Sequence, residues 1–174
     1  MADLMVGDTT LEGVKVIRPP FVHEDHRGVN VETYNRRLYV QAGLFPPEFI
    51  QDSYSWSRHG VLRGIHGDKR TWKLVSCPTG KIYLVVVWPL NLSPLGRAGK
   101  WEAFELSGVN RLQVLIPPHY GNGHLVLSRE AVFAYKLSEY TDTASQFTIR
   151  WNDPAYGIRW PITNPILSKR DGDA

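Results

Sequence analysis

Hydrophobic and polar residues alternate along most of the chain, in short segments rich in valine, isoleucine, tyrosine, phenylalanine and tryptophan. This alternation and these residue types favour β-strands. Turn-forming residues separate several segments, for example at Pro78-Thr79-Gly80 and at Gly121-Asn122-Gly123. Many short strands in succession are typical of an all-β sandwich or barrel. The predicted strands are residues 14–19, 29–35, 49–57, 60–67, 72–77, 81–90, 100–108, 111–118, 123–128, 131–140 and 147–152.

The segments between these strands give little sign of helix or of a second domain. Residues 35–43, NRRLYVQAG, predict one helical turn that ends at Gly43. Residues 91–99 are predicted to form a surface loop, and the segment after Trp160 is predicted to pack as an extended arm before it frays at its end. Because there is no internal repeat and no linker, residues 1–174 are predicted to form a single domain.

Composition and charge narrow the class of protein. The net charge at pH 7 is only +3 and the basic residues are scattered, which argues against nucleic acid but allows a small anionic ligand. The longest apolar run, residues 83–90, is far shorter than the ~20 residues that span a bilayer. The N-terminus lacks the features of a signal peptide and Cys77 is the single cysteine. We therefore expect a cytoplasmic protein with no intramolecular disulfide and no membrane partner.

In the stretch GVLRGIHGDKRTWKLV, residues 60–75, Arg63, His66 and Lys73 interrupt apolar segments that are predicted to be strands. Burying an unpaired charge is costly, so these residues are expected either to face solvent or to line a pocket that uses them. Strict alternation places Arg63 and His66 on opposite faces of their strand. A pocket shared by the two therefore predicts a β-bulge near Gly64 that rotates the chain.

Taken singly, the candidate site residues also have ordinary structural interpretations. His66 can be a core histidine whose hydrogen bonds are satisfied. Lys73 can be an edge-strand lysine that discourages aggregation. Tyr135 can be a core tyrosine with its hydroxyl near the surface, and Asp171 can be a solvated charge near the C-terminus.

The number of histidines raises a metal site as an alternative. A small barrel can hold several inward-facing imidazoles, but the sequence contains no H-x-H pair, and His119 and His124 lie five residues apart across a glycine turn. This spacing suits a ligand set poorly, so we predict no metal site. The six histidines are His23, His26, His59, His66, His119 and His124.

Taken together, a series of segments resembles the dTDP-4-dehydrorhamnose 3,5-epimerase family of nucleotide-sugar epimerases. The segments run in the family's order over nearly the whole chain, and the series is specific although no single segment is. They are DHRGVNVE (25–32), FIQD (49–52), GVLRGIH (60–66), KLV (73–75), KWEAFELS (100–107), IPPHYGNGH (116–124), AYK (134–136), WNDP (151–154) and ILSKRD (166–171).

The resemblance implies a cupin-type antiparallel β-sandwich, or jelly roll, with few short helices, a pocket inside the barrel and no metal or other cofactor. It also implies a homodimer. By the resemblance, His66 is the base, Asp171 holds it as a dyad, Tyr135 is the acid on the opposite face of the sugar, and Lys73 stabilises the enolate oxygen. The residues implied for substrate binding are Arg27 and Arg63, at the diphosphate, together with Glu32, Gln51, Asn122 and Arg170.

The chain departs from the family pattern around the pocket. Asn122 stands where the rhamnose enzymes usually have a histidine, and Asn30 replaces an aromatic residue. Thr141 replaces the second tyrosine of a pair, Gln146 replaces a glutamate, and the loop after His66 is shorter. The dyad and the acid are retained. The segments LRGIHGD, GNGH and QFTIRWNDP resemble a branch that acts on other 4-keto-6-deoxy sugars, including GDP-linked heptoses.

These residue types suit an epimerase that inverts C3, C5 or both of a nucleotide-diphospho-4-keto-6-deoxy sugar through an enolate. A C4 ketone acidifies the C–H bonds at C3 and C5, and a neutral imidazole with an ordinary pKa of ~6.5 can remove such a proton. A cation near O4 stabilises the enolate. The alternatives are a metal-dependent cupin isomerase or dioxygenase, and a non-catalytic sugar-nucleotide-binding cupin. The joint presence of His66, Tyr135 and Asp171 argues against the non-catalytic protein.

Overall fold

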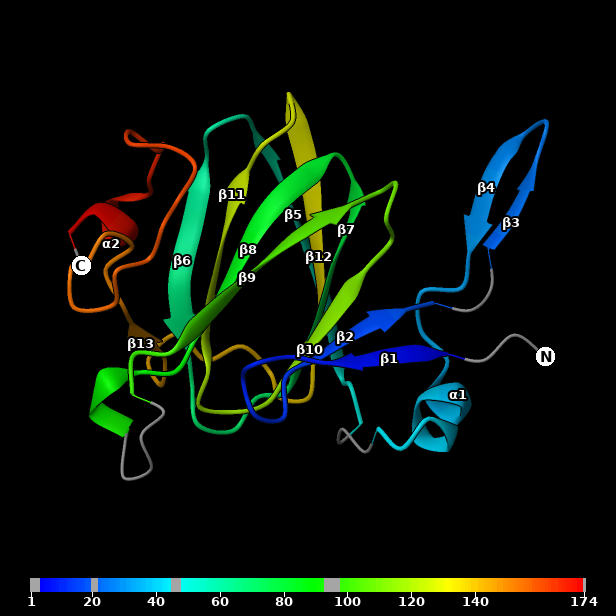
Figure 1. The fold of residues 1–174 in the computed structure, drawn as a ribbon, viewed down its shortest axis with the longest axis horizontal. Coiled ribbons are helices and arrows are strands. Elements are labelled where there is room, and N and C mark those ends of the chain that lie inside the picture. The colour runs from blue at the N-terminus through cyan, green and yellow to red at the C-terminus, as the bar shows by residue number, and fades with distance from the viewer. Residues whose placement is uncertain (1–3, 20–21, 45–47, 93–97, 174) are drawn as a thin grey trace.

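Two antiparallel β-sheets face each other and form a sandwich (Figure 1). The computed structural model describes residues 4–19, 22–44, 48–92 and 98–173. One sheet has six strands, in the order β1 (Met5–Asp8), β2 (Lys15–Arg18), β10 (Gln113–Ile116), β7 (Lys73–Thr79), β12 (Glu130–Leu137) and β5 (Gln51–Arg58). The other has five, in the order β13 (Phe147–Thr148), β6 (Leu62–Gly67), β11 (Gly121–Val126), β8 (Lys81–Val87) and β9 (Trp101–Ser107).

The remaining elements are short. A separate hairpin pairs β3 (Val22–Asp25) with β4 (Gly28–Val31). Helix α1 (Arg36–Gln41) matches the predicted helical turn and begins at Asn35, whose side chain accepts a hydrogen bond from the Leu38 N–H. Of the predicted loop 91–99, residues 93–97 lie outside the described residues, and the 3₁₀ turn η1 (Leu90–Leu92) overlaps its start.

The predicted all-β fold is confirmed, and each predicted strand overlaps an observed one. Strands β1 and β3 were not predicted. All four residues of each are exposed, so neither strand carries the alternation of buried and exposed positions on which such a prediction depends.

The core lies between the sheets and extends beyond one of them. On β8, Ile82, Leu84 and Val86 pack toward the six-stranded sheet in the main core. Val87 belongs to a second cluster, in which Trp101, Tyr156 and Trp160 of neighbouring segments pack on the outer side. Strand β8 is thus covered on both faces, which explains its continuous apolar sequence.

The C-terminal segment packs against the sandwich as the predicted extended arm, and only the predicted fraying at its end is wrong for the described residues, which extend to 173. Ile166 forms a parallel bridge with Val61, and its backbone exchanges hydrogen bonds with Gly60 and Leu62 at 2.8 and 3.0 Å. The segment then turns into the short helix α2 (Lys169–Gly172), where Asp171 is buried. The bridge supplies hydrogen-bond partners for the backbone of this segment. Such a long-range contact cannot be predicted from the proline-containing sequence of the segment itself.

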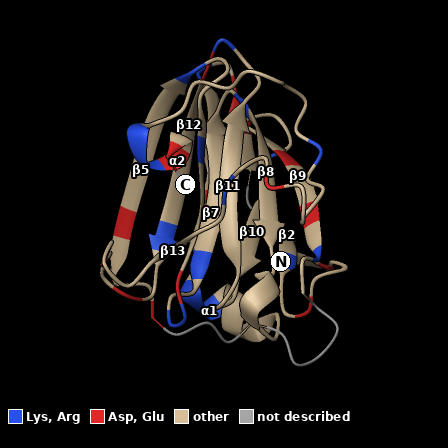
Figure 2. Cartoon of the chain, turned by 90° about the vertical axis from the view of Figure 1, so that its left-hand side faces the viewer, with Lys and Arg blue, Asp and Glu red and all other residues tan. Residues whose placement is uncertain are grey.

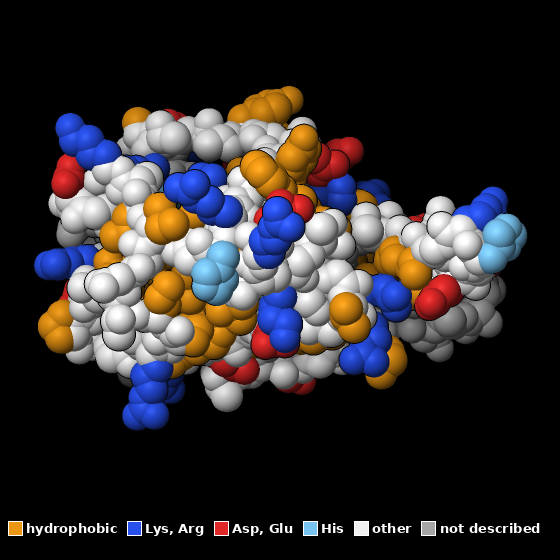
Figure 3. Space-filling view, turned by 90° about the horizontal axis from the view of Figure 1, so that it is seen from above, with side chains coloured by type: hydrophobic (Ala, Val, Ile, Leu, Met, Phe, Trp, Pro, Cys, Tyr) orange, Lys and Arg blue, Asp and Glu red, His pale blue; other side chains and the backbone are white. Residues whose placement is uncertain are grey.

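The β3–β4 hairpin stands clear of the sandwich (Figures 1 and 3). Seven of its eight strand residues are exposed and Val31 is intermediate. On the side of the molecule seen in Figure 2, basic and acidic residues are interspersed over several strands and loops. Within the described part of the chain, no helix has the length and apolar character needed to cross a membrane.

Candidate active site

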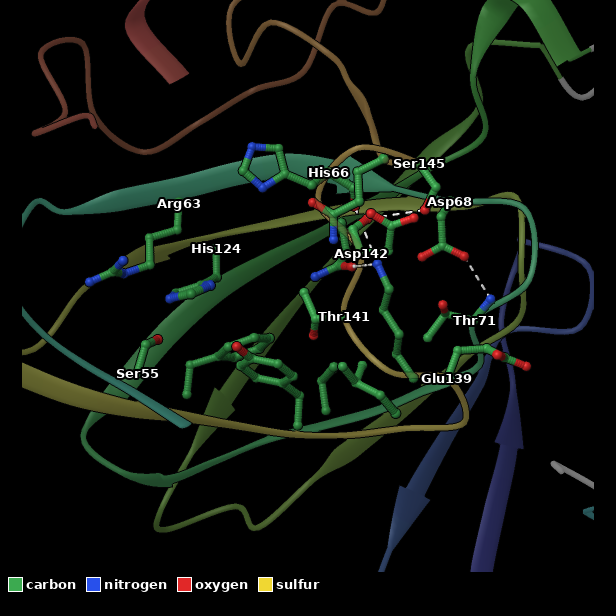
Figure 4. Close-up of a pocket in the computed structure, with 18 of the residues that line it drawn as sticks. Ser55, Arg63, His66, Asp68, Thr71, His124, Glu139, Thr141, Asp142 and Ser145 are labelled. Carbon is green, nitrogen blue, oxygen red and sulfur yellow. Dashed lines mark hydrogen bonds between the residues drawn. The ribbon is translucent and has the colours of Figure 1, made fainter. Parts of the chain in front are cut away.

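A cavity of about 300 Å³ opens between the two sheets (Figure 4). Both sheets and the C-terminal segment contribute to its wall. Six of the predicted site residues line this cavity, although they come from segments far apart in the sequence. They are Arg63, His66, Lys73, Asn122, Tyr135 and Asp171.

The predicted bulge near Gly64 is present and brings Arg63 and His66 to the same cavity. Across the strand pair β6–β11, His66 lies opposite Asn122 while Arg63 lies opposite His124. Three steps on β6 therefore match two steps on β11, which is the pattern of one inserted residue. Gly64 has a φ of +105°, and a Cβ there would lie 2.7 Å from the Asn122 carbonyl oxygen, so glycine is required.

His66 and Asp171 form the predicted dyad. Nε2 of His66 lies 2.7 Å from Oδ1 of Asp171, and Ser168 Oγ donates to the second carboxylate oxygen at 2.9 Å. Burial lowers the pKa of His66 below its ordinary value of 6.5, against the opposing attraction of Asp171. The imidazole is therefore neutral at neutral pH, as a general base requires.

Lys73 is a cavity residue on an inner strand, so the edge-strand interpretation is wrong. Strand β7 pairs with β10 on one side and β12 on the other. The Lys73 ammonium donates to Oδ1 of Asn122 at 2.9 Å and to the His66 carbonyl at 3.3 Å. Burial lowers the pKa of Lys73 to about 8, while the nearby charge of Asp68 opposes that shift.

Tyr135 lines the cavity from the sheet opposite His66. It lies on β12 of the six-stranded sheet, whereas His66 lies on β6 of the five-stranded sheet. Its ring packs beside Phe133 with a centroid separation of 5.4 Å. Its hydroxyl makes no hydrogen bond within the described residues, which leaves it available to a ligand.

Two more predicted residues, Gln51 and Arg170, form hydrogen bonds with residues of the cavity wall. Both of these wall residues stand at positions where the chain departs from the family pattern. Gln51 donates to Thr141 Oγ1 at 2.8 Å, and Arg170 donates to Gln146 Oε1 at 3.2 Å. Thr141 and Gln146 both line the cavity. With the Lys73–Asn122 pair, three of the departures are hydrogen-bonded to predicted site residues.

The structure does not bring Arg27 and Glu32 to the cavity. Arg27 lies in the turn of the β3–β4 hairpin, 79% exposed, and pairs with Asp25 at 2.6 Å. Glu32 accepts a hydrogen bond from Asn35 Nδ2 at 2.9 Å, at the start of α1. Their implied role in substrate binding stays a prediction.

Several residues of the cavity wall were not predicted. They share no motif. Ser55 and Phe133 are cross-strand partners on β5 and β12, which only the register between strands reveals, whereas His124 follows from alternation because it lies two residues after Asn122 on β11. Within the residues that the structure describes, no group of three His, Cys, Asp or Glu side chains is placed to hold a metal ion. The unpredicted wall residues include Ser55, Asp68, Arg70, Thr71, His124, Phe133, Glu139, Tyr140, Asp142 and Ser145.

Comparison with known proteins agrees with this geometry. The family model for dTDP-4-dehydrorhamnose 3,5-epimerase matches residues 8–174. The chain belongs to this family. The dTDP-4-dehydrorhamnose 3,5-epimerase of Shigella flexneri is 37% identical over 159 residues, which cover 90% of this chain and 87% of the relative. The chain is thus a carbohydrate epimerase by family, and the comparisons give no support to the metal-dependent alternative.

Solved structures of the family have the same fold. The dTDP-6-deoxy-D-glucose-3,5-epimerase of Legionella pneumophila, in complex with dTDP-4-keto-L-rhamnose, matches with a TM-score of 0.90 and 34% identity, covering 98% of this chain and 91% of that one. A 3'-monoepimerase of Streptomyces bikiniensis in complex with dTDP-quinovose matches with a TM-score of 0.86 and 29% identity, covering 95% and 84%. The predicted cupin-type sandwich is confirmed.

Proposed function

We propose that the chain inverts C3, C5 or both of a nucleotide-diphospho-4-keto-6-deoxy sugar by removing a proton on one face and returning one on the other. The observation that carries this proposal is the placement of His66 and Tyr135 on opposite sheets around one cavity. Inversion of a carbon centre needs a base and an acid on opposite faces of the sugar. A site with both groups on one wall would only exchange the proton.

The proton transfers follow from the hydrogen bonds of the dyad. A carboxylate only accepts hydrogen bonds, so Nε2 of His66 carries the proton that bonds to Asp171, and Nδ1 carries the lone pair. Nδ1 takes the proton from C3 or C5. The electron pair of that C–H bond moves into the enolate, whose charge builds on the C4 oxygen. The Lys73 ammonium stabilises this charge.

Reprotonation completes the inversion. The Tyr135 hydroxyl donates its proton to the opposite face of the enolate, which restores the ketone and leaves a phenolate. The imidazolium of His66 loses its proton to solvent and the phenolate gains one. No net proton is consumed, so the reaction needs no oxidant, reductant or further reactant.

Two observations bear on which nucleotide and which sugar the chain uses. The relatives named above act on or bind dTDP-sugars, which favours dTDP. The departures at Asn122, Thr141 and Gln146 lie at the cavity, which favours a different sugar or nucleotide, such as a GDP-linked heptose. The similarity to both a 3,5-epimerase and a 3'-monoepimerase leaves C3 alone or both carbons as outcomes of the test.

We also propose a cytoplasmic homodimer, in which each β3–β4 hairpin reaches the partner's pocket. Arg27 is exposed on a hairpin that stands clear of its own sandwich, away from its own cavity. If Arg27 binds a diphosphate, that diphosphate lies in another copy of the chain. A closed two-fold dimer lets both hairpins serve both pockets.

The experiment is incubation in heavy water with dTDP-, GDP- and CDP-linked 4-keto-6-deoxy sugars, followed by NMR. Deuterium should enter at C3, C5 or both, with inverted configuration. His66→Ala should slow this by about 10²- to 10⁴-fold, as expected for loss of a general base. His59→Ala, which removes an exposed histidine that contacts Leu127, is the matched control and should leave the rate unchanged. Wild-type exchange in His66→Ala would remove His66 from the mechanism.

A metal analysis of the same preparation addresses the alternative class. A cofactor-independent epimerase keeps its activity after treatment with a chelator and carries no stoichiometric transition metal. A stoichiometric metal whose removal abolishes exchange would overturn the proposed mechanism.

A further inference from the structure

One end of the cavity is lined by polar groups that the proposed proton transfers do not use. Arg63, His124 and Ser55 lie at this end, away from Asp68, Thr71 and Glu139 at the other (Figure 4). His124 projects from β11 of the five-stranded sheet, and Ser55 from β5 of the six-stranded sheet. The two residues therefore line the space between the sheets from opposite sides.

The strand register explains why these side chains converge. Ser55 is the cross-strand partner of Phe133, and directly opposed residues project to the same face of a sheet. The ring of Phe133 stacks on the ring of His124 at 4.1 Å with an interplanar angle of 23°. His124 is in turn the cross-strand partner of Arg63. Phe133 thus fixes the imidazole plane beside Ser55.

Both groups lack a hydrogen-bond partner within the described part of the chain. Nε2 of His124 and Oγ of Ser55 are buried side-chain atoms with no protein partner there, and His124 is only 3% exposed. Buried polar groups are nearly always hydrogen-bonded, so two unsatisfied atoms on facing walls at one end of the cavity indicate a position for a ligand atom between them.

The chemistry of the pair selects the kind of ligand atom. Burial lowers the pKa of His124 to about 3, and the charge of Arg63 adds to this shift, so the imidazole stays neutral. A neutral imidazole and a serine hydroxyl each donate and accept hydrogen bonds, which matches a hydroxyl group. A phosphate oxygen only accepts, and the neighbouring Arg63 guanidinium suits it better.

We propose that His124 and Ser55 together bind one hydroxyl group of the sugar, and that this contact helps to set which sugar the pocket accepts. The inference rests on the proposed function, because it assumes a sugar nucleotide in this cavity. It assigns to His124 and Ser55 a binding role that is separate from proton transfer.

The test is calorimetric titration of matched pairs: dTDP-quinovose with dTDP, and GDP-rhamnose with GDP. Wild-type protein should bind the sugar nucleotide of at least one pair. His124→Phe keeps the ring stacked on Phe133 but removes the polar atoms, and Ser55→Ala removes one oxygen. Each should weaken binding of the sugar nucleotide by about 3- to 10-fold, the range for one neutral hydrogen bond. Each should leave binding of the free nucleotide unchanged.

The double variant shows whether the two residues share one hydroxyl. If they do, the combined loss is smaller than the product of the two single losses. His59→Phe, an aromatic replacement of an exposed histidine, is the matched control. Unfolding temperatures are measured in parallel for all variants. If His124→Phe does not fold, the affinity of Ser55→Ala alone decides the outcome.

The outcomes separate the inference from the proposed function. Unchanged affinity in both single variants overturns the inference alone. An equal loss for the free nucleotide and the sugar nucleotide also overturns it, because the contact is then to the diphosphate. If wild-type protein binds neither pair and exchanges no deuterium with any of the 4-keto sugar nucleotides, the proposed function fails and the inference fails with it.

Discussion

Asp171 Oδ1 lies 2.7 Å from Nε2 of His66, across a separation of 105 residues in the sequence. The two residues meet because the segment that follows β13 returns along β6 and ends in α2. The carboxylate fixes both the orientation and the tautomer of the imidazole, since it can only accept the Nε2 proton. The proposed role of His66 as a base therefore depends on a residue that lies outside the strands of the sandwich.

Asp171→Asn tests this dependence. An asparagine amide can donate to Nε2 and so hold the imidazole in the other tautomer, which leaves Nδ1 without its lone pair. We expect the rate of deuterium incorporation to fall by about 10²-fold or more, as in other sites where such an aspartate orients a histidine. Asp173→Asn, an exposed residue of the same segment, is the control. Wild-type rates in Asp171→Asn would show that the dyad is structural.

Tyr135→Phe separates the acid from the base. The substitution keeps the packing beside Phe133 but removes the only proposed donor on the second face. His66 can still form the enolate and return the proton from the side it left. We expect exchange with retained configuration to persist while epimer formation falls steeply, both read by NMR in heavy water. A tyrosine with only a structural role predicts that both processes change together, and epimer formation at the wild-type rate would exclude Tyr135 as the acid.

The pH dependence of kcat/KM should be bell-shaped. His66 must be neutral to accept a proton, so activity is lost as pH falls through its pKa, which lies below 6.5. Lys73 must be charged to stabilise the enolate, so activity is lost as pH rises through its pKa of about 8. Lys73→Arg should move the basic limb to higher pH, because a guanidinium stays charged. A basic limb that stays near pH 8 in this variant would assign it to another group.

The hairpin should act between subunits. Light scattering at micromolar concentration should give twice the 19.8 kDa of the chain. Arg27→Ala should raise KM for the sugar nucleotide while the dimer and the unfolding temperature stay unchanged, because Arg27 is exposed within its own chain. Arg129→Ala, another exposed arginine, is the control. A monomer at this concentration, or an unchanged KM, would contradict the proposed role of the hairpin.

Local sequence patterns predict much of the fold but less of the site. Alternation reveals the strands that have one buried face, and it fails for β1 and β3, which have none. Local reasoning also favours a solvated Asp171, because the bridge between Val61 and Ile166 that returns the segment is a long-range contact. The family resemblance supplies Asp171 where the local pattern does not.

The least predictable part of the site is the wall formed by His124, Ser55 and Phe133. Ser55 and Phe133 are unremarkable in their own segments, and the segment IPPHYGNGH that contains His124 does not indicate its neighbours. The proximity of the three residues depends on the register of two strand pairs and on the distance between two sheets. The bulge near Gly64 is the exception. It could be predicted because a shared pocket for Arg63 and His66 is incompatible with regular alternation.

The bulge also determines which positions of this pocket can evolve. A methyl group at Gly64 would lie 2.7 Å from both the Asn122 carbonyl oxygen and the Gly123 Cα, so one mutation there disturbs the His66–Asn122 and Arg63–His124 pairs together. Asn122 and His124 can instead be substituted one at a time while the backbone of the bulge stays unchanged. A library that varies these two positions and keeps Gly64 should therefore yield enzymes with new sugar preferences, whereas a library that varies Gly64 should yield mostly inactive ones.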